Sequence, residues 1–123
     1  MNTSDRPHLQ EFHIEGVKHI QPKDAFESVQ NGEAILLDVR EEYEYAIETI
    51  DLKEIIYLPM SRITAELDQI PTDKPIIVVC KGGVRSSKVA RFLSENGFKD
   101  LASLDGGFVM WKALHFPTEN HLS

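Results

Sequence analysis

The sequence predicts an α/β fold with a mainly parallel central sheet. Two short apolar runs, AILLDV from Ala34 and PIIVVC from Pro75, do not alternate with polar residues, which is typical of strands buried on both faces. Segments with helical periodicity lie between such runs, as in chains that form parallel sheets. The length of 123 residues fits one compact domain.

The first elements follow a polar N-terminal stretch. Residues 1–15 show little periodicity, and we expect a flexible or loosely docked N-terminal tail before a single domain over 16–123. The segment 16–20 is a candidate strand. In the candidate helix over 21–32, Pro22 fits the first helical position and Gly32 ends the helix, and both are common helix boundaries.

The middle of the chain alternates in the same way. After the strand AILLDV, residues 41–48 predict a short acidic helix, and EIIYLP (54–59) predicts a strand that its proline stops. Ser61 is a suitable N-cap for a helix over 62–70, which Pro71 closes.

The last third holds the clearest elements. PIIVVC has four β-branched residues in a row after its proline, which favours a strand. A helix is predicted over 86–98, with an apolar stripe and an Asn-Gly stop. A short strand over 101–104 and a last helix over 106–114 complete the pattern.

Composition excludes several classes of partner. The net charge of -7 at pH 7 argues against nucleic acid or an anionic membrane, because both require a basic surface. We find no apolar stretch long enough to span a membrane and no secretory signal pattern at the N-terminus. A single cysteine cannot form an internal disulfide, so a reducing compartment, by default the cytoplasm, is expected.

That cysteine, Cys80, directly follows the predicted central strand and begins the stretch CKGGVRSS. Binding sites of open parallel sheets lie outside the carboxyl ends of the strands. A thiol is nucleophilic as its thiolate, which a helix N-terminus and nearby cations stabilise. Here a helix is expected to begin near Ser86, and Lys81 and Arg85 supply cations.

Two glycines complete this loop. Gly82 and Gly83 can adopt backbone angles that turn several N–H groups inward, which would form an anion-binding cradle with the thiol at its base. Ser86 can cap the helix or turn its hydroxyl toward the cradle. The alternative interpretation is structural, since a lone cysteine at the end of a buried strand is often a small core residue.

Three stretches of the sequence resemble those of single-domain rhodaneses, a sulfurtransferase family. LLDVREEYEYAIETI resembles the family pattern L-[IL]-D-V-R-x-x-x-E-[FY]-x-x-G-H-I. VVCKGGVRSSKVARFLSENGF resembles the family's active-site loop and the helix after it, and LASLDGGFVMW resembles its L-x-G-G-x-x-x-W close. The resemblance runs from about His19 to Pro117.

The resemblance implies a fold and a site. The fold is a five-stranded parallel sheet with helices on both sides. Cys80 would be the nucleophile that accepts a sulfane sulfur as a persulfide, and Asp38 with Arg40 would form a structural clamp near it. The substrate-binding residues would be those of the loop and the start of its helix: Lys81, Gly82, Gly83, Val84, Arg85 and Ser86.

The loop length separates two chemistries within this superfamily. Cysteine phosphatases use C-x5-R, whereas Arg85 stands here at C-x4-R. The shorter loop favours a sulfur atom over the larger phosphate or arsenate, so a phosphatase or an arsenate reductase is the less favoured enzyme. A rhodanese-fold interaction module with little turnover is the alternative of another class, and the intact loop cysteine argues against it.

The implied reaction sets the expected partners. The donor would be a small anion such as thiosulfate or a polysulfide, and the acceptor an external thiol, a protein or cyanide, since no second cysteine can receive the sulfur. No cofactor is required. We expect no metal, because the five histidines lack ligand spacing, and we expect the glutamates at 41, 42, 44 and 48 to form a solvated helix face.

Two departures from the family pattern lie outside the loop. Residues 48–53, ETIDLK, replace G-H-I-P-G-A and add about two residues before Leu58, which leaves the shape of this turn open. His115 stands where a glycine is expected before the final aromatic-proline pair. Histidine tolerates a left-handed conformation better than most residues but less well than glycine.

Overall fold

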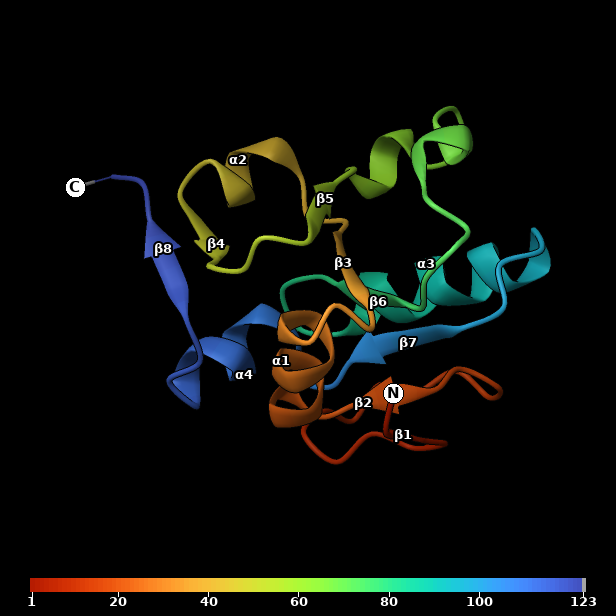
Figure 1. Ribbon diagram of the computed structural model, residues 1–123, viewed down its shortest axis with the longest axis horizontal. Coiled ribbons are helices and arrows are strands. Elements are labelled where there is room, and N and C mark those ends of the chain that lie inside the picture. Colours follow the sequence, from red (N-terminus) through yellow and green to blue (C-terminus); the bar gives the residue numbers. More distant parts are fainter. Residues whose placement is uncertain (123) are drawn as a thin grey trace.

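A six-stranded sheet forms the centre of the structure, a computed structural model that describes residues 1–122 (Figure 1). The strand order is β1-β2-β7-β6-β3-β5, and every neighbouring pair is parallel except β1 with β2. The α/β prediction is therefore confirmed, and the antiparallel edge strand β1 is an addition. The bounds are β1 Thr3–Ser4, β2 His19–Ile20, β3 Ile35–Asp38, β5 Ile55–Tyr57, β6 Ile76–Val79 and β7 Leu101–Leu104.

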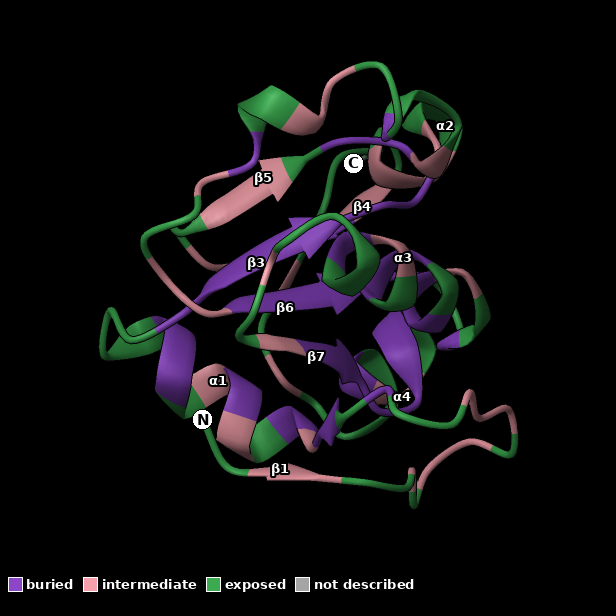
Figure 2. Cartoon of the chain, turned by 90° about the vertical axis from the view of Figure 1, so that its right-hand side faces the viewer, coloured by how far each residue is buried: buried purple, intermediate pink, exposed green. Residues whose placement is uncertain are grey.

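Helices cover both faces of this sheet, because side chains of the inner strands alternate between two apolar clusters. Helix α3 (Val84–Glu95) packs on one face, and α1 (Pro22–Gln30) and α4 (Gly107–Ala113) pack on the other. In β3, for example, Leu37 belongs to the α3 side and Leu36 to the side of α1 and α4. The inner strands β3 and β6 are accordingly buried along their length (Figure 2).

The helix predicted over 62–70 is wrong. This stretch forms two short 3-10 helices, η1 (Met60–Arg62) and η2 (Leu67–Gln69), joined by a turn. Ser61 caps nothing, since its hydroxyl donates to Glu41 at 2.7 Å. Ile63 and Ile70 are buried in the core, so tertiary packing shapes a segment too short to be a stable helix alone.

At both departures from the family pattern, segment 48–53 and His115, the structure shows a defined local conformation. The predicted acidic helix ends early, as α2 (Glu42–Tyr45), and the altered segment forms β4 (Glu48–Ile50), which pairs antiparallel with β8 (Thr118–Asn120). His115 follows α4 with a φ of 65°, so it adopts the left-handed conformation for which glycine was expected.

The N-terminal segment lies along the edge of the sheet and reaches the end where the strands finish. The backbone N–H groups of His8 and Leu9 donate to the buried carboxylate of Asp105, at 2.6 and 3.0 Å. The side chain of Gln10 accepts from Gly106 N at 2.8 Å. These contacts join the N-terminal segment to the rest of the chain. The division into a flexible tail over 1–15 and a domain over 16–123 stays a prediction.

Candidate active site

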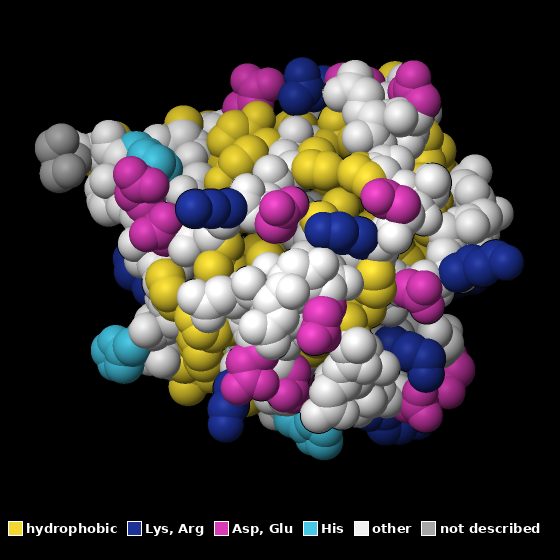
Figure 3. Space-filling view, viewed as in Figure 1, with side chains coloured by type: hydrophobic (Ala, Val, Ile, Leu, Met, Phe, Trp, Pro, Cys, Tyr) yellow, Lys and Arg dark blue, Asp and Glu magenta, His cyan; other side chains and the backbone are white. Residues whose placement is uncertain are grey.

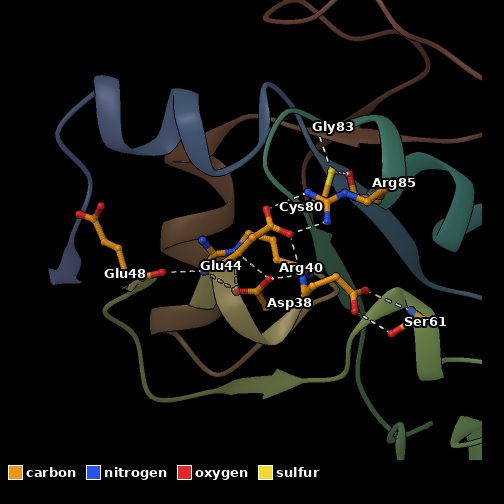
Figure 4. Close-up of polar contacts among 10 residues, drawn as sticks. Asp38, Arg40, Glu44, Glu48, Ser61, Cys80, Gly83 and Arg85 are labelled. Atoms are coloured by element: carbon orange, nitrogen blue, oxygen red, sulfur yellow. Dashed lines mark hydrogen bonds and ion pairs between the residues drawn. The ribbon is translucent and has the colours of Figure 1, made fainter. Parts of the chain in front are cut away.

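Cys80 lies directly after β6, at the carboxyl end of the sheet and before α3. It is buried, with 1% of its surface exposed. Its Sγ accepts a hydrogen bond of 3.1 Å from the backbone N–H of Gly83, so the Cys80 loop (residues 80–85) folds back over the sulfur (Figure 4). The structure thus places one backbone N–H, that of Gly83, against the sulfur; the anion cradle of several inward N–H groups stays a prediction.

Helix α3 begins two residues earlier than predicted. Gly83 occupies the N-cap position with a φ of 99°, a conformation that side chains other than glycine rarely adopt. Ser86 therefore lies inside the first turn and does not cap the helix. Its buried hydroxyl instead lies 3.3 Å from Cys80 Sγ and 2.7 Å from Ser103 Oγ on β7. A chain of two hydroxyl groups ends at the sulfur.

Helix α4 fixes the back of the Cys80 loop. The backbone N–H groups of Phe108 and Val109 donate to the carbonyls of Cys80 and Lys81, at 2.9 and 3.0 Å. The approach is close enough that a Cβ on Gly107 would lie 2.5 Å from the carbonyl oxygen of Lys81. Only glycine fits at this position without a shift of the backbone, which explains the second glycine of the LDGG stretch.

Arg85 is engaged by a carboxylate from another element. Its Nη1 and Nη2 donate to Glu44 Oε1 and Oε2 at 2.6 and 2.9 Å (Figure 4). The hydrogen bond from Arg85 lowers the pKa of Glu44, and the same bond raises the pKa of Arg85. Both groups are therefore charged at neutral pH. The pair links α2 to the Cys80 loop.

Asp38 and Arg40 form a second pair nearby, and both side chains are buried. Arg40 Nη2 donates to Asp38 Oδ2 at 2.9 Å, and Arg40 Nε lies 3.1 Å from both oxygens. The guanidinium also donates to the carbonyl of Glu48 at 2.8 Å and lies over the ring of Phe108, 4.3 Å from its centre. These contacts join β3, β4 and α4 around the site.

The remaining loop residues lie at the surface. Lys81, Gly82 and Val84 are exposed around the buried sulfur. Lys81 is thus the loop's solvent-facing cation. The predicted site residues come together at the carboxyl end of the sheet, because Asp38 ends β3 beside Val79, the last residue of β6, which Cys80 follows.

The expectation of a solvated glutamate face is wrong for three of the four positions. Glu44 pairs with Arg85, Glu48 with Lys112 at 2.7 Å, and Glu41 accepts from Ser61, whereas Glu42 is exposed. The family pattern carried a signal for Glu44, because its glutamate stands four residues after Arg40.

Two further contacts of the site escaped sequence reasoning. Ser103 is the one hydroxyl residue in an otherwise apolar strand, a signal that was available. Gln10 donates to Gly83 O at 3.4 Å from a segment that was expected to be a tail, and no local pattern marks it.

Other site types find little support in residues 1–122. These residues contain no cluster of three or more histidine, cysteine or acidic side chains arranged to hold a metal ion. No helix in this part of the chain is long and apolar enough to cross a membrane. On the face shown in Figure 3, acidic and basic side chains are interspersed.

Comparisons with known proteins point to one family. The family model described as "Rhodanese-like domain" matches residues 21–114. The chain is 36% identical over 103 residues to the thiosulfate sulfurtransferase GlpE of Coxiella burnetii, which covers 84% of this chain and 94% of that protein.

Solved structures give the same result. A rhodanese-related protein from Thermoplasma volcanium aligns with a TM-score of 0.74 at 28% identity, over 82% of this chain and 96% of that one. Reduced Bacillus anthracis CoADR-RHD aligns with a TM-score of 0.73 at 34% identity, over 80% of this chain and 17% of that one.

Proposed function

Because this chain belongs to the rhodanese-like domain family and is a rhodanese-type sulfurtransferase, we propose that it carries sulfane sulfur as a persulfide on Cys80. The observation that supports this most directly is the position of its one cysteine. Cys80 Sγ lies 3.1 Å from the N–H of Gly83 at the start of α3, where an anionic sulfur is stabilised.

The proposed reaction has two steps. The Cys80 thiolate attacks the outer sulfur of a donor such as thiosulfate. The bond between that sulfur and the sulfonate sulfur breaks, and sulfite leaves with the electron pair. The enzyme then holds an anionic persulfide, stabilised by the backbone N–H of Gly83, the hydroxyl of Ser86 and the N-terminus of α3.

In the second step an acceptor removes the outer sulfur. A thiolate, or cyanide in a laboratory assay, attacks it, and Cys80 leaves as the thiolate that began the cycle. Covalent transfer of this kind predicts ping-pong kinetics and needs no cofactor. With one cysteine in the chain, we propose an external thiol or protein as the acceptor, in a reducing compartment such as the cytoplasm.

Mass measurement tests this function. Reduced protein treated with thiosulfate should gain the mass of one sulfur atom, and cyanide should remove it as thiocyanate. Cys80→Ser should abolish both steps while the protein stays folded. Cys80→Ser combined with Ser94→Cys, which places a thiol on the exposed face of α3, should also gain no stable cyanide-labile sulfur.

Two results would contradict the proposal. Full sulfur transfer by Cys80→Ser would exclude Cys80 as the carrier. A free thiol after every donor would favour the interaction module. Turnover of p-nitrophenyl phosphate by the wild type would instead revive the phosphatase alternative.

A further inference from the structure

The Cys80 loop carries two cations, but they are not equivalent. Lys81 is exposed, whereas Arg85 is partly covered and both of its terminal nitrogens donate to Glu44. Arg85 is therefore not a free positive charge that faces an arriving donor. Together Lys81, Arg85 and Glu44 carry one net positive charge.

The carboxylate of Glu44 is held in place from its other side. Glu44 Oε1 also accepts the backbone N–H of Glu41 at 3.0 Å, which closes a capping box at the start of α2. Glu41 in turn accepts the hydroxyl of Ser61 at 2.7 Å. The side chain of Glu44 is only 13% exposed, so it stays against Arg85 and does not move freely in solvent.

From this geometry we propose that Glu44 is a specificity-determining residue, which lowers the preference of the site for donors that carry two negative charges. This inference rests on the proposed sulfur transfer. Glu44 adds a fixed negative charge beside the Cys80 loop, which the donor must approach to reach the sulfur. Its repulsion is larger for a dianion than for a monoanion that transfers the same sulfur.

Two donors isolate that difference. Thiosulfate carries two negative charges and releases sulfite. Methanethiosulfonate carries one, has a methyl group in place of one oxygen, and releases methanesulfinate. Both break a bond between a sulfane sulfur and a sulfonyl sulfur, and both leave the same persulfide on Cys80. The ratio of their kcat/KM values, the donor ratio, therefore reports the charge of the site.

The test replaces one carboxylate with its amide. Glu44→Gln keeps an oxygen that can accept from Arg85 but removes the charge. We expect the donor ratio, thiosulfate over methanethiosulfonate, to rise about three- to tenfold. Added salt should reduce this gain because it screens charge. The matched control is Glu42→Gln on the same helix, where the carboxylate is 68% exposed and pairs with Arg62; its donor ratio should change less than about twofold.

A measurement on the wild type keeps the test valid even if the variant does not fold. In the wild type the charge of Arg85 is neutralised by Glu44. We therefore expect kcat/KM for thiosulfate to fall by no more than about twofold between roughly 0.05 and 0.3 M salt. A steeper fall would show that Arg85 acts on the donor as a second positive charge beside Lys81, and it would overturn the inference. An unchanged donor ratio in Glu44→Gln, or an equal rise in Glu42→Gln, would also overturn it.

The same data separate this inference from the proposed function. If the wild type gains no cyanide-labile sulfur from either donor, the proposed function fails. If it gains sulfur from both donors and Glu44→Gln leaves the donor ratio unchanged, the assignment of Glu44 alone fails.

Discussion

Two arginine–carboxylate pairs lie at the carboxyl end of the sheet, and they differ in burial. In Asp38–Arg40 both side chains are 4% exposed, whereas in Glu44–Arg85 they are 13% and 30% exposed. The first pair joins core elements, and the second joins α2 to the Cys80 loop. Residues of the same chemistry thus have different tasks, because an ion pair influences an arriving substrate only where its field reaches the solvent.

Breaking the buried pair should have the largest effect. Asp38→Asn leaves the Arg40 guanidinium without its counter-charge inside the protein, and the free energy of unfolding should fall by about 3–5 kcal/mol. Urea denaturation measures the loss. A loss below about 1 kcal/mol would contradict a structural role for this pair.

The partly exposed pair, Glu44–Arg85, should contribute less to stability, and its contribution should depend on pH. Arg85 lowers the pKa of Glu44 in the folded protein, so the stabilisation is present above the ordinary glutamate pKa and is lost as pH falls through the lowered value. Glu44→Gln should cost at most about 1 kcal/mol at neutral pH.

That difference between wild type and Glu44→Gln should shrink toward zero in unfolding experiments below about pH 4. The comparison between the two proteins cancels the titration of the other carboxylates. A cost that persists undiminished at low pH would show that the amide damages packing and not charge.

A third arginine–carboxylate pair is exposed, and removing its carboxylate should have the smallest effect on stability. Arg91 and Glu95 lie one turn apart on α3, with side chains 61% and 63% exposed. Glu95→Gln should lower the free energy of unfolding by no more than about 0.3–0.5 kcal/mol, with no change in donor ratio. A cost as large as that of Glu44→Gln would show that burial does not order these three pairs.

Sequence reasoning succeeded where the signal is local. The buried strands β3 and β6 are continuous apolar runs, and Cys80 follows one of them directly, so the loop and its place at the sheet end were predictable. Strands β1 and β8 are two and three residues long, and their existence depends on partners far away in the chain.

The side-chain partners of the site were harder to predict for the same reason. Glu44 and Arg85 are 41 positions apart, so only the fold brings them together. The hydroxyl chain from Ser103 to Ser86 similarly crosses from a strand to a helix. Gly83 and Ser86, which contact the sulfur, were named as site residues from the sequence. The roles of Glu44 as the partner of Arg85 and of Ser103 as the partner of Ser86 were not.

The close approach of α4 to the Cys80 loop has a consequence for the energetics of turnover. Since the carbonyls of Cys80 and Lys81 are already bound to the N–H groups of Phe108 and Val109, the conformational entropy of this loop is lost when the chain folds. No ordering of the backbone is then required each time a donor arrives. The proposed sulfur transfer starts from a loop whose backbone dipoles are already oriented. The reorganisation that the reaction requires is therefore mainly that of the donor and its hydration shell.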